Sequence, residues 1–203
     1  MVTEGKALGA GRVVFVMVHG RNASPEKILT LVSDLRVDDA TYLAPAAAGG
    51  SWYPNGFMAA TDSNEPGIIN GIAAVHACID QAIAAGVPAE RIVLLGFSQG
   101  ACLAGTAAVR RPTRYGGVIM YSGGLIGPPG VVWPHDGSFK GTPVFLGCSD
   151  VDGHIPAERV RESAAHFERM GASVTMRLYP GMGHQVSEDE LAFTRATVAG
   201  ITG

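Results

Sequence analysis

Runs of apolar residues alternate along the chain with segments that have helical spacing or composition. The run from Val13 to Val18 is apolar on both faces and rich in β-branched residues, which is typical of a strand covered on both sides. Similar runs predict strands at 41–44, 91–96, 118–121, 143–146 and 174–179. Helices are predicted at 24–35, 67–85, 99–109, 157–170 and 187–199. This alternation predicts an α/β fold with a mostly parallel central sheet and helices on both faces.

Two of these helices have clear start signals. Ser24 followed by Pro25 forms an N-cap with proline in the first turn, so one helix is expected from there to about Leu35. Ser187 and Glu190 have the spacing of a capping box, which predicts the start of the last helix.

The length of 203 residues predicts one domain, 1–203, and no composition shift suggests a boundary. Only about 20 residues separate Tyr121 from Thr142, too few for an inserted cap domain, because domains usually begin near ~50 residues. We therefore expect an open site.

Composition narrows the function classes. The net charge is −3, charged residues make up 16%, and no basic block is present, which argues against a nucleic-acid partner. The apolar runs are too short to span a bilayer, and the first residues lack the pattern of a signal peptide. Cys78, Cys102 and Cys148 are widely spaced, which argues against a disulfide framework or zinc site and predicts a cytoplasmic location.

The strongest chemical signal is the motif Gly96-Phe97-Ser98-Gln99-Gly100, which lies between a predicted buried strand and a helix. A nucleophilic serine in this position needs a sharp turn, and glycines on either side remove Cβ atoms that would clash. The helix that begins at Gln99 directs free N–H groups toward an oxyanion formed beside Ser98.

A nucleophilic serine needs an imidazole base. Of the six histidines, His184 follows the strand 174–179 in a glycine-rich loop, whereas His76 and His166 fall in predicted helices and His135 in a loop. His184 is therefore the predicted base.

The third member of a Ser-His-acid triad is a carboxylate, which should lie between the serine and the histidine in chain order. Asp150 and Asp152 both follow the strand 143–146, and spacing does not decide between them. Asp150 could instead brace its loop. For His154, a place beside the substrate and a role in loop packing both stay open.

Taken together, four segments in this order resemble the phospholipase/carboxylesterase family of α/β-hydrolases, which includes the acyl-protein thioesterases. They are His19-Gly20, the Ser98 motif, Asp152 to Pro156, and Tyr179 to His184. The resemblance implies Ser98 as nucleophile, Asp152 as orienting acid with Asp150 in support, and His184 as base. It also implies that the backbone N–H groups of Arg21 and Gln99 form the oxyanion hole. The family often has a small or apolar residue in place of Arg21, so its side chain is expected to be free to influence substrate choice.

Apolar side chains in the loops after two strands are candidates for the substrate pocket. A hydrophobic plug beneath a long loop is the alternative for the first cluster. The candidates are Trp52, Tyr53, Phe57, Met58, Leu125 and Trp133.

The sequence thus predicts a serine carboxylester hydrolase that acts on neutral acyl or aryl esters through an acyl-enzyme and without a metal or organic cofactor. Lysophospholipase and acyl thioesterase activities are alternatives within the family. A metal hydrolase built on Asp150, Asp152, His154 and His184, and a binding module on the same scaffold, are alternatives of other classes. The expected partner is a small-molecule ester, and a homodimer is compatible with the sequence.

Overall fold

The computed structural model describes residues 1–202 and contains one seven-stranded sheet. Its order is β1-β3-β2-β4-β5-β6-β7, with β1 antiparallel to β3 and all other neighbours parallel. The strands are β1 Val2–Gly5, β2 Val13–Val18, β3 Ala40–Ala44, β4 Ile92–Phe97, β5 Gly117–Tyr121, β6 Pro143–Ser149 and β7 Ser173–Tyr179. The predicted strands and the mostly parallel sheet are confirmed.

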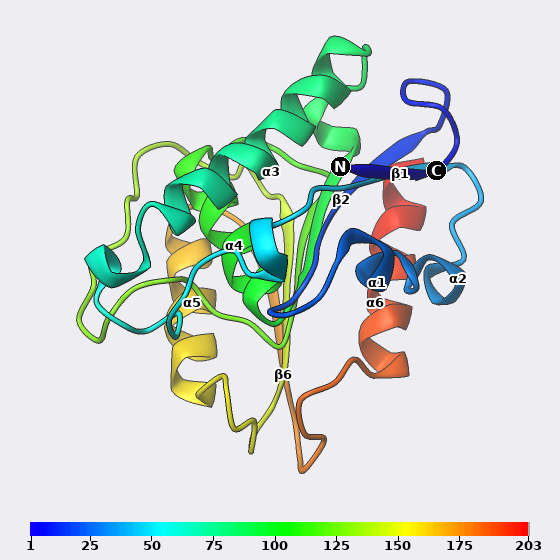
Figure 1. The fold of residues 1–203 in the computed structure, drawn as a ribbon. Coiled ribbons are helices and arrows are strands. Elements are labelled where there is room, and N and C mark those ends of the chain that lie inside the picture. The colour runs from blue at the N-terminus through cyan, green and yellow to red at the C-terminus, as the bar shows by residue number, and fades with distance from the viewer. Residues whose placement is uncertain (203) are drawn as a thin grey trace.

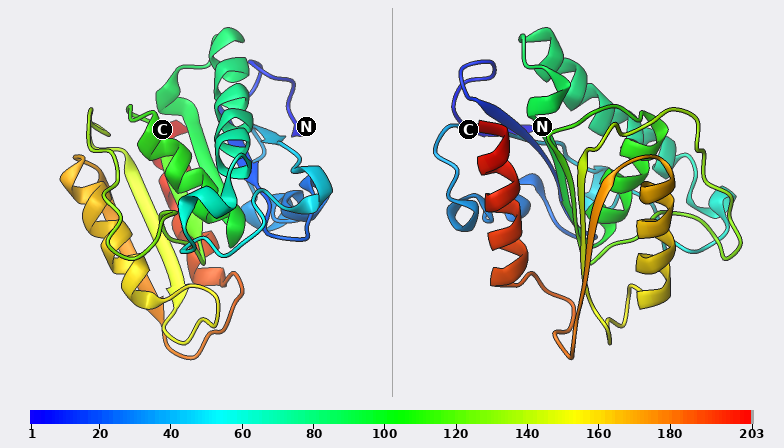
Figure 2. Two further views of the ribbon diagram at one scale, coloured as in Figure 1. Left: turned by 60° about the vertical axis from the view of Figure 1, so that its left-hand side comes forward. Right: turned by 180° about the vertical axis from the view of Figure 1, so that it is seen from behind.

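Helices cover both faces of the sheet, as Figures 1 and 2 show. On one face lie α3 (Gly67–Ala84), α4 (Gln99–Arg110) and α5 (Ala157–Arg169); on the other lie α1 (Pro25–Leu29), α2 (Val32–Leu35) and α6 (Glu188–Thr202). Alternate residues of β2 divide between two cores: Val14 and Val16 face the α3 side, and Val13 and Phe15 face the α6 side. Both faces of a central strand are thus buried, which explains its uninterrupted apolar run.

The prediction of one continuous helix from Ser24 to Leu35 is wrong. This segment forms α1 and α2, and between them Thr30 and Leu31 donate their N–H groups to carbonyls three residues back. The Thr30 hydroxyl also donates to the Lys27 carbonyl at 2.8 Å, so a side chain competes for the helical acceptor at the break. Ser24 does cap α1, accepting the Lys27 N–H at 3.3 Å.

Two other features complete the fold. The Ser187 capping box is confirmed, because its N–H donates to the Glu190 carboxylate at 2.7 Å. β1 was not predicted, since its four residues are mostly exposed and only pairing with β3 orders them as a strand.

Helix α3 is the one described helix long and apolar enough to cross a membrane by length and composition. A third of it is buried in the protein, and Ile68, Val75 and Ile79 pack into the core beside α4. A helix that packs on a sheet also has an apolar inner face, so the composition of α3 is explained by its place in the core.

Between β5 and β6, residues 122–142 contain no helix or strand. The segment lies against the α4 and α5 side, so within residues 1–202 it forms no cap domain over the carboxyl ends of the strands. In Figure 1 these ends are at the lower edge of the sheet, where the loops after β6 and β7 extend. The chemistry-bearing loops therefore meet at one edge.

Candidate active site

Ser98 occupies a strained turn between β4 and α4. Its φ is 55° and its ψ is −122°, a conformation that costs a residue with a side chain of the order of 1–3 kcal/mol. A Cβ on Gly96 would lie 2.4 Å from the Gly100 carbonyl oxygen, and a Cβ on Gly100 would lie 2.1 Å from that of Val18. The two glycines thus permit the close approach that projects the Ser98 side chain from the sheet edge.

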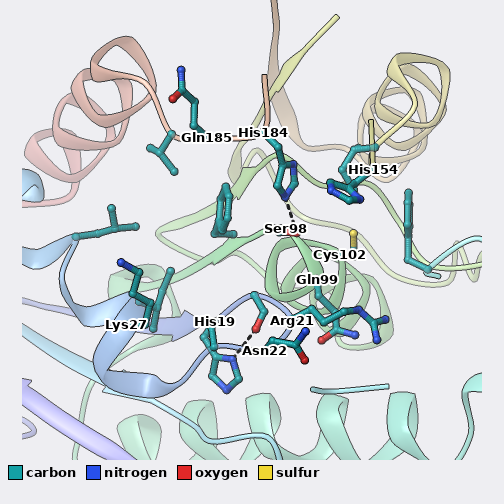
Figure 3. A pocket seen from close by; sticks show the side chains of 18 of the residues that line it. His19, Arg21, Asn22, Lys27, Ser98, Gln99, Cys102, His154, His184 and Gln185 are labelled. Carbon is teal, nitrogen blue, oxygen red and sulfur yellow. Dashed lines mark hydrogen bonds between the residues drawn. The ribbon is translucent and has the colours of Figure 1, made fainter. Parts of the chain in front are cut away.

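His184 lies in the loop between β7 and α6 and faces Ser98. Its Nε2 is 2.8 Å from Ser98 Oγ, as the dashed line in Figure 3 shows. The loop is fixed from β6: Ser149 Oγ accepts the Gly183 N–H at 3.0 Å, and Asp150 accepts the Gly181 N–H at 2.9 Å. Of the two roles left open for Asp150, the structure shows loop bracing.

Asp152 is the acid that reaches the histidine. Its Oδ2 lies 2.7 Å from His184 Nδ1, and Oδ1 accepts the N–H groups of His154 at 2.8 Å and Ile155 at 3.1 Å. Burial raises the pKa of this carboxyl, but these hydrogen bonds outweigh burial and leave the pKa below its usual value. An ionised Asp152 only accepts, so His184 carries its proton on Nδ1 and presents Nε2 to the serine hydroxyl.

Cys148 adds a contact that sequence reasoning missed. Its Sγ lies 3.7 Å from Asp152 Oδ2, and burial raises the pKa of this thiol to about 12. The thiol therefore stays protonated and donates to the carboxylate. No motif signals this role, which depends on the turn after β6.

Two backbone N–H groups lie at the cavity around Ser98, that of Arg21 in the loop after β2 and that of Gln99 at the start of α4. Among the described residues, the N–H groups of Arg21 and Gln99 donate to no protein acceptor. His19 fixes this loop: it accepts the Ala47 N–H on Nε2 at 3.2 Å, and so donates from Nδ1 to the Gly20 carbonyl at 2.8 Å. Burial lowers the pKa of His19, which favours this neutral form.

The side chains of Arg21 and Gln99 hold the loop at 51–55. Arg21 donates to Ser51 Oγ at 3.3 Å, to the Pro54 carbonyl at 2.7 Å and to the Asn55 carbonyl. Gln99 accepts the Trp52 N–H at 3.0 Å and donates to the Tyr53 carbonyl at 2.8 Å. The expectation that the Arg21 side chain is free is wrong, because three hydrogen bonds tie its guanidinium to this loop.

A cavity of about 830 Å³ surrounds Ser98 (Figure 3). Tyr53 and Phe57 line it, as predicted from the sequence. His154, for which a place beside the substrate was one of two open roles, also lines it. Further lining side chains that sequence reasoning missed come from α1 and its following turn, the end of β4, α4 and the loop after β6: Lys27, Ile28, Leu31, Phe97, Cys102 and Ile155. The position of α1 directly after β2 could have indicated that its residues line the pocket, because sites in such sheets lie at the carboxyl ends of strands.

Four predicted pocket residues do not line this cavity. Trp52 is buried beneath the loop and donates from Nε1 to the His19 carbonyl at 2.8 Å, and Met58 packs against the core. Leu125 is fully buried, and Trp133 lines a separate cavity beside α5. The loop after β5 turns away from the strand ends because its N–H groups bind hydroxyls of α4 and α5, as when Leu125 donates to Ser163 Oγ at 2.8 Å.

The positions of Asp150, Asp152 and His154 bear on the alternative of a metal hydrolase. His154 does lie beside His184, with ring centroids 4.9 Å apart, but Asp150 and Asp152 are bound to backbone N–H groups or to His184. Within residues 1–202, no three His, Cys, Asp or Glu side chains are grouped as metal ligands. What the site presents is a hydroxyl, an imidazole and a carboxylate in series, beside two free amides, which suits acyl transfer.

Comparisons with known proteins identify the family of this chain. Residues 35–199 match the family described as Phospholipase/Carboxylesterase. Acyl-protein thioesterase 1 of Gibberella zeae is 35% identical over 119 residues, 57% of this chain and 50% of that protein. Its namesake in Saccharomyces cerevisiae is 30% identical over 132 residues, 62% of this chain and 56% of the relative. The chain thus spans about half the length of these curated relatives.

The solved structures extend the likeness to the whole chain. A phospholipase/carboxylesterase from Dyadobacter fermentans has a TM-score of 0.93 and 38% sequence identity, and covers 98% of this chain and 95% of its own. The family match, the sheet order and the serine turn agree. The chain belongs to the phospholipase/carboxylesterase family of α/β-hydrolases.

Proposed function

We propose that the protein is a serine carboxylester hydrolase in which Ser98, His184 and Asp152 act as a catalytic triad. The observation that carries this proposal is the continuous hydrogen-bonded series from Ser98 Oγ through both ring nitrogens of His184 to Asp152, at 2.8 and 2.7 Å. Such a series lets the imidazole accept the serine proton while the carboxylate stabilises the imidazolium that forms.

The reaction has two halves. His184 Nε2 takes the proton of Ser98 as Oγ attacks the ester carbonyl, and the tetrahedral oxyanion is bound by the N–H groups of Arg21 and Gln99. His184 then gives its proton to the leaving alcohol, and an acyl-enzyme remains on Ser98. His184 then deprotonates a water molecule, which attacks that acyl group. The bond to Ser98 Oγ breaks, His184 returns the proton to this oxygen, and the carboxylic acid is released.

Two features support the oxyanion assignment. Gln99 is the first residue of the twelve-residue helix α4, so its N–H points away from the helix at the end where the dipole is positive. The Arg21 N–H lies on a loop fixed by His19 and by its own side chain. Preorganised donors of this kind contribute about 2.7–4 kcal/mol each to transition-state binding.

The pocket supports an apolar acyl or aryl group on the substrate. Tyr53, Phe57 and Ile155 supply apolar parts of its wall. Lysophospholipase and acyl thioesterase activities remain alternatives, and the relatives from Gibberella zeae and Saccharomyces cerevisiae carry the name acyl-protein thioesterase. A panel of 4-nitrophenyl esters and matched thioesters, with acyl chains of about two to sixteen carbons, separates ester from thioester hydrolysis by the kcat/KM values.

Covalent trapping tests the proposal against a binding module. A fluorophosphonate should add one phosphonyl group to Ser98, found by peptide mass spectrometry, and labelling should be absent in His184→Ala. Labelling that survives prior incubation with a metal chelator separates this mechanism from the metal alternative. Failure of the wild-type protein to label would contradict the proposal.

We also propose a cytoplasmic location. The three cysteines are unpaired and buried, as expected of a chain that folds with reduced thiols. A homodimer remains a prediction that sedimentation equilibrium measures.

A further inference from the structure

The charges that line the pocket differ from those of the chain as a whole. The net charge is −3, yet the described lining residues include Arg21 and Lys27 and no aspartate or glutamate. The nearby Asp152 carboxylate is fully buried and bound to His184. Two cationic side chains thus line the cavity with no carboxylate among the lining residues, in a protein of negative net charge.

The charge of Arg21 is not neutralised by an acid. Its guanidinium donates to a hydroxyl and two carbonyl oxygens of the loop at 51–55, all of them neutral. Among the described residues it forms no ion pair. Three of its five N–H donors are used in this way, and its positive charge remains.

Lys27 has both its charge and its donors available. It lies on α1, is exposed and lines the pocket together with the apolar side chains of Ile28 and Leu31. Its ammonium makes no hydrogen bond or ion pair with another described residue, whereas its backbone N–H is fixed by Ser24. A lysine ammonium provides three donors, which suit carboxylate or phosphate oxygens.

Figure 3 shows how Lys27 is placed relative to the nucleophile. Lys27 and Gln185 lie on one side of Ser98, and Cys102 and His154 lie on the other. The ester group at Ser98 would extend to both sides. One side leads along α1 to the ammonium of Lys27, and the other leads past Cys102 and His154.

We infer that Lys27 determines specificity for esters that carry a negative group, a carboxylate or a phosphate, on the part of the substrate that lies along α1. This inference rests on the proposed function and departs from the neutral ester expected from the sequence. Lys27 binds the anion by charge and hydrogen bonds, while the rest of the cavity holds the uncharged part of the ester. At a partly exposed site, one such pair changes kcat/KM by about five-fold, because unit charges 4 Å apart in water interact with about 1 kcal/mol.

Two matched ester pairs test the inference. One has the charge on the acyl side, mono-4-nitrophenyl adipate against 4-nitrophenyl hexanoate. The other has it on the alcohol side, 4-(butanoyloxy)benzoate against 4-(butanoyloxy)benzamide. The measured quantity is the ratio of kcat/KM for the anionic ester to that for its neutral partner, after subtraction of spontaneous hydrolysis.

Three variants are compared with the wild type. Lys27→Met keeps the apolar length of the side chain and removes the charge, Lys27→Arg keeps the charge, and Lys6→Met removes a lysine that does not line the pocket. We expect Lys27→Met to lower the ratio about five-fold in one pair, and Lys27→Arg and Lys6→Met to change it less than two-fold. The wild-type ratio in that pair should also fall in about 1 M sodium chloride, where the Debye length is about 3 Å.

The outcomes separate this inference from the proposed function. If the neutral esters are hydrolysed and Lys27→Met changes neither ratio by two-fold, the inference is wrong and the proposed function stands. If the wild type hydrolyses none of the four esters faster than Ser98→Ala does, the proposed function itself fails. A fall in the ratio equally large in Lys6→Met would show a general charge effect and would also overturn the inference.

Discussion

The guanidinium of Arg21 donates to the carbonyl oxygen of Pro54 at 2.7 Å, so one residue links the loop after β2 to the loop that carries Tyr53 and Phe57. The same residue supplies a backbone N–H to the proposed oxyanion hole. The pocket wall and the oxyanion donor are therefore held by one side chain. Loss of the side chain should disturb both.

We predict that Arg21→Met lowers kcat/KM for 4-nitrophenyl butyrate by about ten-fold, because the backbone N–H remains but its loop loosens. Removal of an oxyanion-hole donor itself lowers kcat by more, about 10²–10³-fold. Arg91→Met, at an exposed arginine outside the pocket, is the control. Equal activity of Arg21→Met and the control would contradict this role.

The two acids of the loop after β6 should differ sharply. Asp152→Asn should lower kcat by about 10³–10⁴, because the imidazole loses the carboxylate that orients it. Asp150→Asn should lose less than about ten-fold, since an amide oxygen can still accept the Gly181 N–H. Steady-state kinetics at one pH measures both, and a larger loss in Asp150→Asn would reverse the assignment.

Acid should weaken the fold partly through Asp152. Its pKa is lowered in the folded protein, so the stabilisation that it provides is complete above the unfolded-state pKa and is lost as pH falls through the folded-state pKa. The difference in free energy of unfolding between wild type and Asp152→Asn should therefore shrink as pH falls from about 5 to 3. Urea titrations across this range measure it, and a difference that grows toward acid would have the wrong sign.

Gly100 should tolerate no side chain. Gly100→Ala would place a Cβ 2.1 Å from the Val18 carbonyl oxygen, and overpacking of this kind costs at least about 1–3 kcal/mol. Gly200→Ala is the matched control, because nothing lies within 4 Å of its Cβ position and it lies in α6. Thermal unfolding should show a lower Tm for Gly100→Ala alone; similar Tm values for both variants would mean that the turn can relax.

The pocket wall gives a further prediction. Phe57→Ala enlarges the cavity, so the acyl length with the highest kcat/KM should increase, whereas Met58→Ala should leave the profile unchanged because Met58 does not line the cavity. A shift in Met58→Ala instead of Phe57→Ala would mean that the neighbouring residue forms the wall.

The parts of the fold that could be predicted from the sequence are those with a local cause. β2 is recognisable because burial on both faces requires apolar residues at every position, and the start of α6 because Ser187 and Glu190 bind each other across one turn. The Ser98 turn needs Gly96 and Gly100 whatever surrounds it. These signals lie within a few residues of the feature that they predict.

The parts that could not be predicted depend on distant partners. Trp133 lies in a loop that the hydroxyls of α4 and α5 draw away from the pocket, and Arg21 is used by loop carbonyls more than thirty positions further along the chain. The choice between Asp150 and Asp152 also needs the position of the His184 loop. Side-chain partners of this kind have no periodic pattern.

The kcat/KM of Ser98→Ala for 4-nitrophenyl butyrate, against that of the folded wild type, tests the central claim most directly. Circular dichroism and Tm establish that the variant is folded. Alanine adds no atom at position 98, because serine already has a Cβ. The account predicts a loss of about 10⁶ in rate, to the level of an enzyme without its nucleophile. A folded Ser98→Ala that retains a tenth of the wild-type activity would contradict the claim that Ser98 forms the acyl-enzyme.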